Sequence, residues 1–368
     1  MQELRPPQYG HDQRVPCAAV MHLTLAHLRV GSAAMPAAPR YAHPIGVSLG
    51  DMVPPERIGE RARELERLGY SHLMIPEDYF YEPALVCTTL ALGATESVPI
   101  GTSIVSGMVR HPAVLAMEIA GISRAFPGRF RPGIGLGLPE WLRQMGFMPE
   151  KPVAALRESV GAIRRLLAGE TVTLEGTHFS LDEIAITHPA SEHVPIAMGV
   201  SGPMLLRLAG ELADTTLFAA SAGVDYFRFG RERVERGLAK AGRPGDAMAY
   251  STIALTCVDR DGARAREALR PMLGGFLAEF GVNTMTDAYG ISEELAAMIE
   301  RGGEEAVTAG MPDEWLEDLT LTGSPDEVVA KIRWWLEAGL DSICIFNPDP
   351  ELEERTIALV ASDVIPNL

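Results

Sequence analysis

The chain has 368 residues, of which 47% are hydrophobic and 22% are charged, and its formal net charge at pH 7 is −17. Nucleic acid and anionic membrane surfaces both require a basic face, so this charge argues against either as a partner. No apolar run reaches the roughly 18 residues that a membrane span needs, and four scattered cysteines are typical of a reduced, cytoplasmic protein.

Residues 1–40 are rich in Pro, Ala, Gln and His and show no hydrophobic period. The weakly apolar stretch within them is interrupted by two His and an Arg, which is unlike a signal peptide. We therefore expect a disordered N-terminal extension over residues 1–40 and a single folded domain over residues 41–368.

From residue 44 onward, short apolar runs alternate with amphipathic segments that have helix-start and helix-stop signals. Continuous apolar runs of this length are typical of strands that are buried on both faces. The runs cover residues 44–49, 71–76, 98–105, 130–136, 194–200, 214–220, 250–258 and 341–346. Helices are predicted between them, and residues 324–339 are the clearest case, with a Ser N-cap, Pro at the first helical position and a closing Gly.

Eight strands that alternate with helices predict a parallel sheet with right-handed crossovers. Closed on itself, such a sheet is a (β/α)8 TIM barrel, an α/β fold. The chain is longer than a minimal barrel, so two insertions are expected: a hairpin at 171–181 after the fourth helix, and a polar helical segment at about 282–322 between the seventh and eighth strands. An open doubly wound sheet is the alternative, but residues 45–55 lack the G-x-G-x-x-G pattern expected after its first strand.

In a barrel, working groups lie where strands end. Glu77 and Asp78 follow the second strand, where a carboxylate suits proton transfer or loop capping. His111 precedes a helical Pro, where capping is the simpler role. The loop at 199–203 leads into a helix that begins with Pro and suits a phosphate, although any tight strand-to-helix turn has the same pattern. Neither metal-ligand spacing nor a G-x-S-x-G elbow occurs.

Three segments, 128–146, 195–214 and 322–343, together resemble the bacterial luciferase-like superfamily of flavin and deazaflavin oxidoreductases. The branch of methylenetetrahydromethanopterin reductases and related enzymes that use coenzyme F-420 is the most similar. The resemblance implies a TIM barrel and hydride transfer between coenzyme F-420 and a small-molecule substrate. An FMN-dependent monooxygenase and a non-catalytic flavin-binding protein are the alternatives. The resemblance also implies a homodimer, which is common in this superfamily.

The resemblance further implies which residues contact the coenzyme. The family has a cis peptide bond in a bulge that ends the third strand and presses on the ring, and the matching bond here is Ser103–Ile104. Backbone amides after the fifth strand would hold the phosphate, and the loop after the fourth strand would lie near the ring. The implied cofactor-binding residues are Ser103, Ile104, Gly135, Leu136, Gly137, Val200, Ser201 and Gly202.

The chain departs from the family where protons are handled. Glu77 matches the Asp of a family Asp-His pair, but Asp78 replaces the His. Leu138 and Ser48 stand where family members carry acids. The methanopterin reaction itself is therefore not expected. Either Glu77, Asp78, His111 or Glu140 takes over as a catalytic residue, or the reaction needs little help from an acid. The expected substrate is a small apolar molecule because the predicted pocket walls are apolar, namely Phe80, Met108, Val109, Leu136, Leu138 and Trp141.

Overall fold

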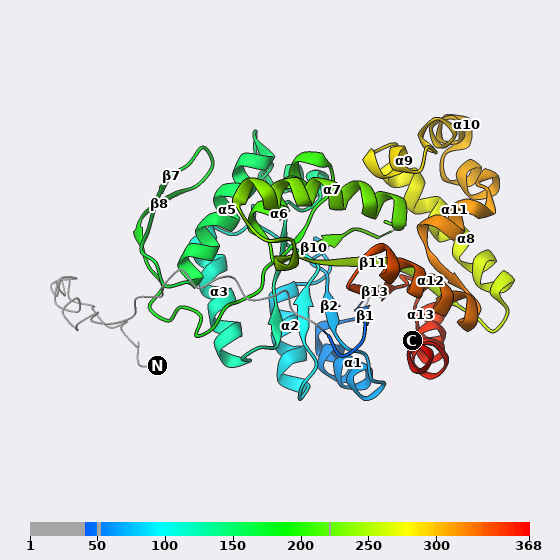
Figure 1. Ribbon diagram of the computed structural model, residues 1–368, viewed down its shortest axis with the longest axis horizontal. Helices are drawn as coiled ribbons and strands as arrows, with labels where there is room; N and C mark the ends of the chain where they lie inside the picture. Colours follow the sequence, from blue (N-terminus) through cyan, green and yellow to red (C-terminus); the bar gives the residue numbers. More distant parts are fainter. Residues whose placement is uncertain (1–40, 50–52, 221) are drawn as a thin grey trace, which may run out of the picture. The chain divides into compact units, whose positions relative to one another are not determined.

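The computed structural model describes residues 41–49, 53–220 and 222–368. The prediction of a disordered extension over residues 1–40 lies outside the described residues. Parallel strands form the centre of the fold (Figure 1). They are β1 (Ile45–Ser48), β2 (Leu73–Ile75), β3 (Ile100–Thr102), β4 (Val105–Ser106), β5 (Phe130–Arg131), β6 (Gly133–Gly135), β9 (Ala197–Gly199), β10 (Thr215–Phe218), β11 (Ala249–Val258) and β13 (Ser342–Phe346).

These strands form a closed barrel, in which the third and fourth predicted strands are each divided into two pieces. The hydrogen-bonded path runs β4-β6-β9-β10-β11-β13-β1-β2-β3-β5, and every pairing along it is parallel. β4 continues β3 across a bulge, and β6 continues β5 across Pro132. The two ends of the path therefore belong to the same pair of neighbouring strands. All eight predicted strands are confirmed, and with them the TIM barrel.

Helices alternate with the strands, as the sequence predicts. The helices that follow the first six barrel strands are α1 (Pro55–Arg67), α2 (Ala84–Ala94), α3 (Pro112–Ala125), α4 (Pro139–Met145), α5 (Pro152–Leu167), α6 (Pro203–Leu212) and α7 (Val224–Ala241). The later part of the chain contributes α8 (Gly262–Phe280), α12 (Pro325–Ala338) and α13 (Pro350–Leu359), followed by two short turns at Val360–Val364 and Ile365–Asn367; a 3-10 turn at Gly245–Ala247 precedes β11.

The predicted caps of residues 324–339 are present. The Ser324 hydroxyl accepts from the Glu327 backbone N–H, the Glu327 carboxylate accepts from the Ser324 N–H, and Gly339 ends the helix with a φ of 111°. This reciprocal pairing satisfies two backbone N–H groups that would otherwise lack partners.

Both predicted insertions are present. The hairpin consists of the antiparallel strands β7 (Val172–Glu175) and β8 (Ser180–Ile184). The Glu158 carboxylate on α5 holds its turn by accepting from the backbone N–H groups of residues 177–179. The second insertion contains α9 (Thr284–Ala288), α10 (Ser292–Gly310) and α11 (Asp313–Leu319), and α10 is kinked at Gly302–Gly303. A short strand, β12 (Leu321–Gly323), then pairs with the end of β11.

Side chains from several strands fill the inside of the barrel. Met74, Leu217 and Cys344 form a small buried cluster, with Ile104 and Ile253 packed against it. The thiols of Cys87, Cys257 and Cys344 are free and buried. In the described part of the chain, no helix is long and apolar enough to cross a membrane.

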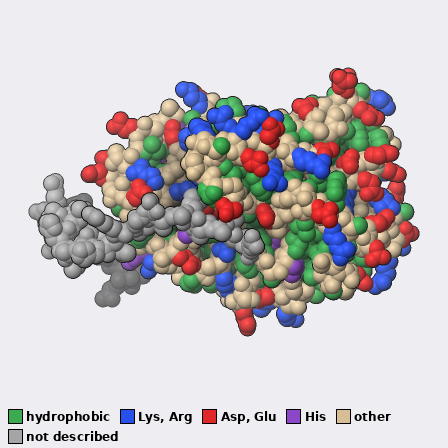
Figure 2. Space-filling model, in the orientation of Figure 1, with side chains coloured by type: hydrophobic (Ala, Val, Ile, Leu, Met, Phe, Trp, Pro, Cys, Tyr) green, Lys and Arg blue, Asp and Glu red, His purple; other side chains and the backbone are tan. Residues whose placement is uncertain are grey.

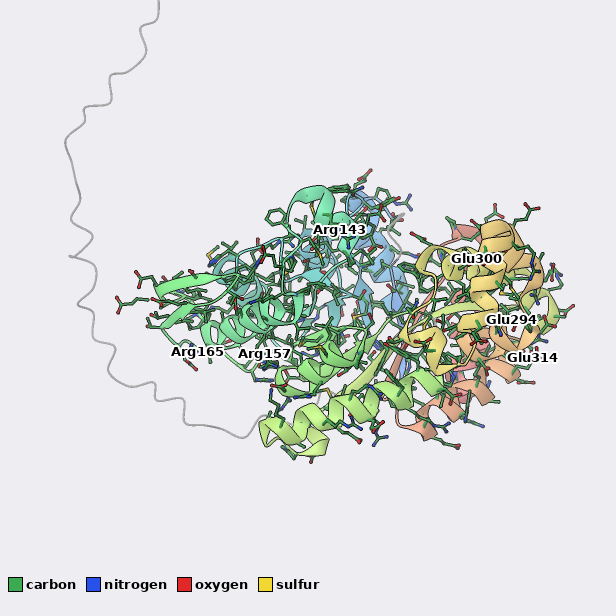
Figure 3. All side chains as sticks on the ribbon, turned by 90° about the horizontal axis from the view of Figure 1, so that it is seen from above. Arg143, Arg157, Arg165, Glu294, Glu300 and Glu314 are labelled. Atoms are coloured by element: carbon green, nitrogen blue, oxygen red, sulfur yellow. The ribbon has the colours of Figure 1, made fainter. Side chains whose placement is uncertain are left out.

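Charge is distributed unevenly over the surface. Acidic side chains gather at the end of the domain that carries α10 and α11 (Figure 2). Figure 3 shows Glu294, Glu300 and Glu314 on these insertion helices, whereas Arg157 and Arg165 project from α5 at the other end. The insertion is therefore poorly suited to bind an anionic ligand on its outer surface.

Candidate active site

The bulge between β3 and β4 lies at the end of the barrel where strands lead into helices. The peptide bond Ser103–Ile104 is cis, as the resemblance implied. Hydrogen bonds hold the bulge on both sides: the Ser103 N–H donates to the Ile75 carbonyl at 2.8 Å, and the Thr102 hydroxyl bonds both the carbonyl and the N–H of Gly133 at 2.9 Å. The backbone at this point is thus fixed by strands two and four together.

Three glycines make room for the Ile104 side chain. A Cβ added at Gly199 would lie 2.5 Å from Ile104 Cγ2, one at Gly135 would lie 2.8 Å from its Cδ1, and one at Gly133 would lie 3.2 Å from its Cγ2. Contacts below 3.0 Å are far inside van der Waals separation. The glycines at the ends of strands four and five are therefore required because the Ile104 side chain of the bulge occupies the space that a Cβ would need.

Ser103 has a polar atom without a partner. Its hydroxyl oxygen is buried, and no hydrogen-bond partner for it exists among the described residues. Buried polar groups are nearly always satisfied by protein, water or ligand. An unsatisfied hydroxyl at the bulge, next to an Ile104 side chain that packs over Gly135 and Gly199, fits a site for a flat, polar-edged ring such as a flavin or deazaflavin.

The loop after β9 has an open backbone at the start of α6. Gly202 is the N-cap with a φ of 79°, and a Cβ added there would meet nothing within 4 Å. Val200 is buried, whereas Ser201 is exposed. The Gly202 N–H makes one long hydrogen bond of 3.4 Å to the Tyr226 hydroxyl. Exposed amides at a helix start suit a phosphate, and Tyr226 is a neighbour that sequence reasoning missed.

The loop after β6 is tied to strand three through Ser106. The Ser106 hydroxyl donates to the Leu136 carbonyl at 2.6 Å and accepts from the Met108 N–H at 3.1 Å. Gly137 has a φ of 89°, and a Cβ there would lie 3.2 Å from Ser106 Cβ. Gly135, Leu136 and Gly137 therefore lie directly beside the bulge, as expected.

Glu77, which follows the second strand, is buried and paired with an arginine. Its side chain is 2% exposed and forms a two-pronged ion pair with Arg110, whose Nη1 and Nη2 donate to Oε2 and Oε1 at 2.8 and 2.7 Å. The Tyr79 hydroxyl donates to the same Oε2 at 2.9 Å. Hydrogen bonding to Glu77 raises the pKa of Arg110 above its usual value. Both carboxylate oxygens already accept hydrogen bonds, so Glu77 is arranged as an acceptor.

Tyr79 lies between this ion pair and α4. Its ring packs edge-on against Trp141, with 6.0 Å between ring centroids. Burial, followed by the nearby Glu77 charge and the hydrogen bond to it, raises the pKa of the Tyr79 hydroxyl. The next peptide bond, Tyr79–Phe80, is also cis, which no sequence pattern predicted. Phe80 itself is 72% exposed.

His111 and Asp78 have structural contacts. His111 is the N-cap of α3: Nδ1 accepts from the Ala113 N–H at 3.3 Å, and Nε2 lies 3.2 Å from the Ser180 carbonyl of the hairpin. Asp78 is half-buried, and its backbone carbonyl accepts from the Tyr81 N–H at 2.8 Å. The surroundings of His111 favour the capping role over the catalytic one.

The expected apolar wall is only partly present. Leu136, Leu138 and Trp141 are half-buried at the strand-four end, where they can contact a ligand. Met108 is 2% exposed and belongs to the main core, so it is not a wall of this site.

Comparison with known proteins places this geometry in a family. The sequence profile of the luciferase-like monooxygenase family matches residues 21–342. The chain belongs to the luciferase-like monooxygenase family. It is a luciferase-like oxidoreductase.

Its relatives within the family include deazaflavin enzymes. The chain is 28% identical over 325 residues to 5,10-methylenetetrahydromethanopterin reductase of Methanolobus tindarius, covering 87% of this chain and 99% of the relative. It is 29% identical over 327 residues to the F-420-dependent glucose-6-phosphate dehydrogenase of Nakamurella multipartita, covering 85% and 93%. The structure of the coenzyme F-420-dependent tetrahydromethanopterin reductase of Methanopyrus kandleri superposes with a TM-score of 0.77 at 25% identity, covering 88% of this chain and 99% of that one.

Proposed function

We propose that this protein transfers a hydride between the deazaflavin coenzyme F-420 and a small apolar organic substrate. The observation that carries the proposal is the strand-three bulge, where the Ser103 hydroxyl is buried without a partner among the described residues and the neighbouring Ile104 side chain packs closely over Gly135 and Gly199. The F-420 dependence of the Nakamurella multipartita dehydrogenase and of the Methanopyrus kandleri reductase supports the choice of coenzyme.

The chain's own residues would bind and orient the coenzyme. Ser103 and Ile104 would lie against the ring with the loop Gly135–Gly137, while the amides of Ser201 and Gly202 would hold the phosphate. When bound, the coenzyme supplies the hydride chemistry, and the protein contributes positioning and exclusion of water. Leu136, Leu138 and Trp141 would contact an apolar substrate.

Turnover under anaerobic conditions tests this function. Oxidised coenzyme F-420 is mixed with the protein and, one at a time, small alcohols, and reduced coenzyme is mixed with small ketones and activated alkenes. We expect at least one substrate to change the coenzyme's visible absorption at a rate proportional to protein concentration. A protein that instead consumes oxygen with reduced FMN would be a monooxygenase, the family's other activity. Tight binding with no turnover of any compound would indicate a binding protein.

We also propose that the chain forms a homodimer through α2 and α3. α2 contains no charged residue, although it lies at the surface. A helix that is apolar all round is normally covered. A groove of about 420 Å³ lies between the two helices, and it is lined by Leu85, Val86, Thr89, Leu90, Glu118, Gly121 and Ile122. Because this face lacks an excess of one charge sign, two copies can meet there without strong repulsion.

Met117→Glu tests the dimer, because Met117 is 57% exposed on α3. Two copies of the new charge would be buried together, so we expect monomers by light scattering at a concentration where the unmodified protein is dimeric. Leu68→Glu is the control, since Leu68 is an exposed apolar residue that directly follows α1, and its substitution should leave the dimer intact. Dimers of Met117→Glu would show that α2 and α3 are not the interface.

A further inference from the structure

The Tyr79 side chain is held from two sides at the mouth of the candidate site. Its hydroxyl donates to Glu77 Oε2 at 2.9 Å, and its ring is edge-on to Trp141. Since the phenol proton is used on Glu77, the hydroxyl oxygen has lone pairs left to accept from another donor. The Tyr79 residue is half-buried.

Glu77 is the hydrogen-bond acceptor of Tyr79. Arg110 holds the carboxylate with two short hydrogen bonds, and its own Nε lies 3.5 Å from Glu118 on α3. Glu77 is 2% exposed, so its contact with a substrate would have to run through Tyr79.

Tyr79 also adjoins the loop assigned to the coenzyme. The Ser106 hydroxyl lies near the Tyr79 hydroxyl and donates to the Leu136 carbonyl at 2.6 Å. Gly137 packs against the same Ser106. A continuous set of contacts therefore runs from Arg110 through Glu77, Tyr79 and Ser106 to the strand-four loop, and it joins the ends of three barrel strands.

We infer that Tyr79 is the catalytic residue that takes the proton from an alcohol substrate and that Glu77, positioned by Arg110, receives the proton that Tyr79 gives up. The inference rests on the proposed function. The substrate O–H bond breaks as a new Tyr79 O–H bond forms, and the original Tyr79 proton moves to Glu77. The substrate C–H electron pair leaves as a hydride to the deazaflavin, and the substrate becomes a ketone or aldehyde. This relay assigns proton transfer to Tyr79 and Glu77. It does not need acids at positions 48 and 138, where this chain has Ser48 and Leu138.

Tyr79→Phe tests the relay, because the ring and its packing on Trp141 are retained. We expect kcat for oxidation of cyclohexanol, 2-propanol or benzyl alcohol to fall about 100-fold, the usual loss for one general base, while the affinity for coenzyme F-420 is unchanged. Tyr81→Phe is the matched control: Tyr81 lies in the same loop, is 61% exposed, and should behave like the unmodified protein.

A second measurement needs no turnover. Protein labelled with 3-fluorotyrosine is studied by fluorine NMR in the absence of coenzyme. The Tyr79 resonance is the one that is lost from the spectrum of Tyr79→Phe. We expect cyclohexanol to shift this fluorine resonance and methylcyclohexane, which lacks the hydroxyl, to leave it in place. An unshifted Tyr79 resonance, or an undiminished kcat in Tyr79→Phe, overturns the inference. Coenzyme binding without oxidation of any of the three alcohols also overturns it but leaves the proposed function standing, whereas failure to bind coenzyme overturns the proposed function itself.

Discussion

Replacing Asp214 with Ala is expected to lower the free energy of unfolding by about 3–5 kcal/mol, the usual cost of breaking a buried ion pair. The Asp214 side chain is 3% exposed. Its Oδ2 accepts from Arg164 Nη2 at 2.5 Å and from the Ile196 N–H at 2.8 Å, and its Oδ1 lies 3.2 Å from His193 Nε2. Burial alone would raise the pKa of Asp214, but the hydrogen bond and charge of His193 and the charge of Arg164 hold it below its usual value.

The loss is large because the partners cannot replace Asp214. Without the carboxylate, the Arg164 guanidinium is left mostly buried without its counter-charge, and the Ile196 N–H loses its acceptor at the start of strand five. Glu60→Ala is the control: Glu60 is 63% exposed in a surface pair with Arg57, so its loss should cost less than about 1 kcal/mol. Urea unfolding of both variants measures the difference, and equal midpoints would show that the Asp214 network contributes little.

Gly135→Ala is expected to destabilise the protein by about 1–3 kcal/mol, the usual cost of overpacking, and to weaken coenzyme F-420 binding more than about tenfold. The added Cβ would lie 2.5 Å from the Gly199 carbonyl oxygen and 2.8 Å from Ile104 Cδ1. The Gly199 oxygen is backbone in a paired strand, so the strand-four end or the Ile104 bulge must move. Either movement displaces backbone that is assigned to the ring.

Gly161→Ala provides the matched control for this substitution. Gly161 lies within α5, and a Cβ there would meet nothing within 4 Å. Alanine should raise stability by roughly 0.5–1 kcal/mol, because it favours the helix over the unfolded chain, and coenzyme affinity should not change. If Gly135→Ala binds the coenzyme as tightly as Gly161→Ala does, the strand-four loop is not part of the coenzyme site.

The barrel was predictable from the sequence because each strand is a short apolar run that is buried on both faces. The strand-three bulge was predictable only through family resemblance, since nothing local in residues 101–104 requires a cis bond. The ion pair between Glu77 and Arg110 was missed because its members are 33 residues apart and meet only when strands two and three are neighbours. His111 is different, because a His directly before a helical Pro already pointed to the cap that the structure contains.

The contacts of Tyr79 and Tyr226 with other elements could not be seen in the sequence for the same physical reason. The Tyr226 hydroxyl meets the Gly202 amide, and the Tyr79 ring meets Trp141, whereas Glu77 is only two residues from Tyr79 in the same loop. Sequence patterns report which face of an element is buried, but they do not report which polar atoms meet across the end of a barrel. The location of the candidate site was therefore predictable from the ends of the strands. The hydrogen bonds and ring contacts within it became visible only in the structure.

The central claim is that the strand-three bulge and its neighbouring loops bind a deazaflavin. Fluorescence quenching during titration of the purified protein with coenzyme F-420, and separately with FMN, tests this most directly. We predict saturable binding of coenzyme F-420 at micromolar or lower concentration and weaker binding of FMN. Saturable binding of neither, or tighter binding of FMN, would contradict the assignment of this site to a deazaflavin.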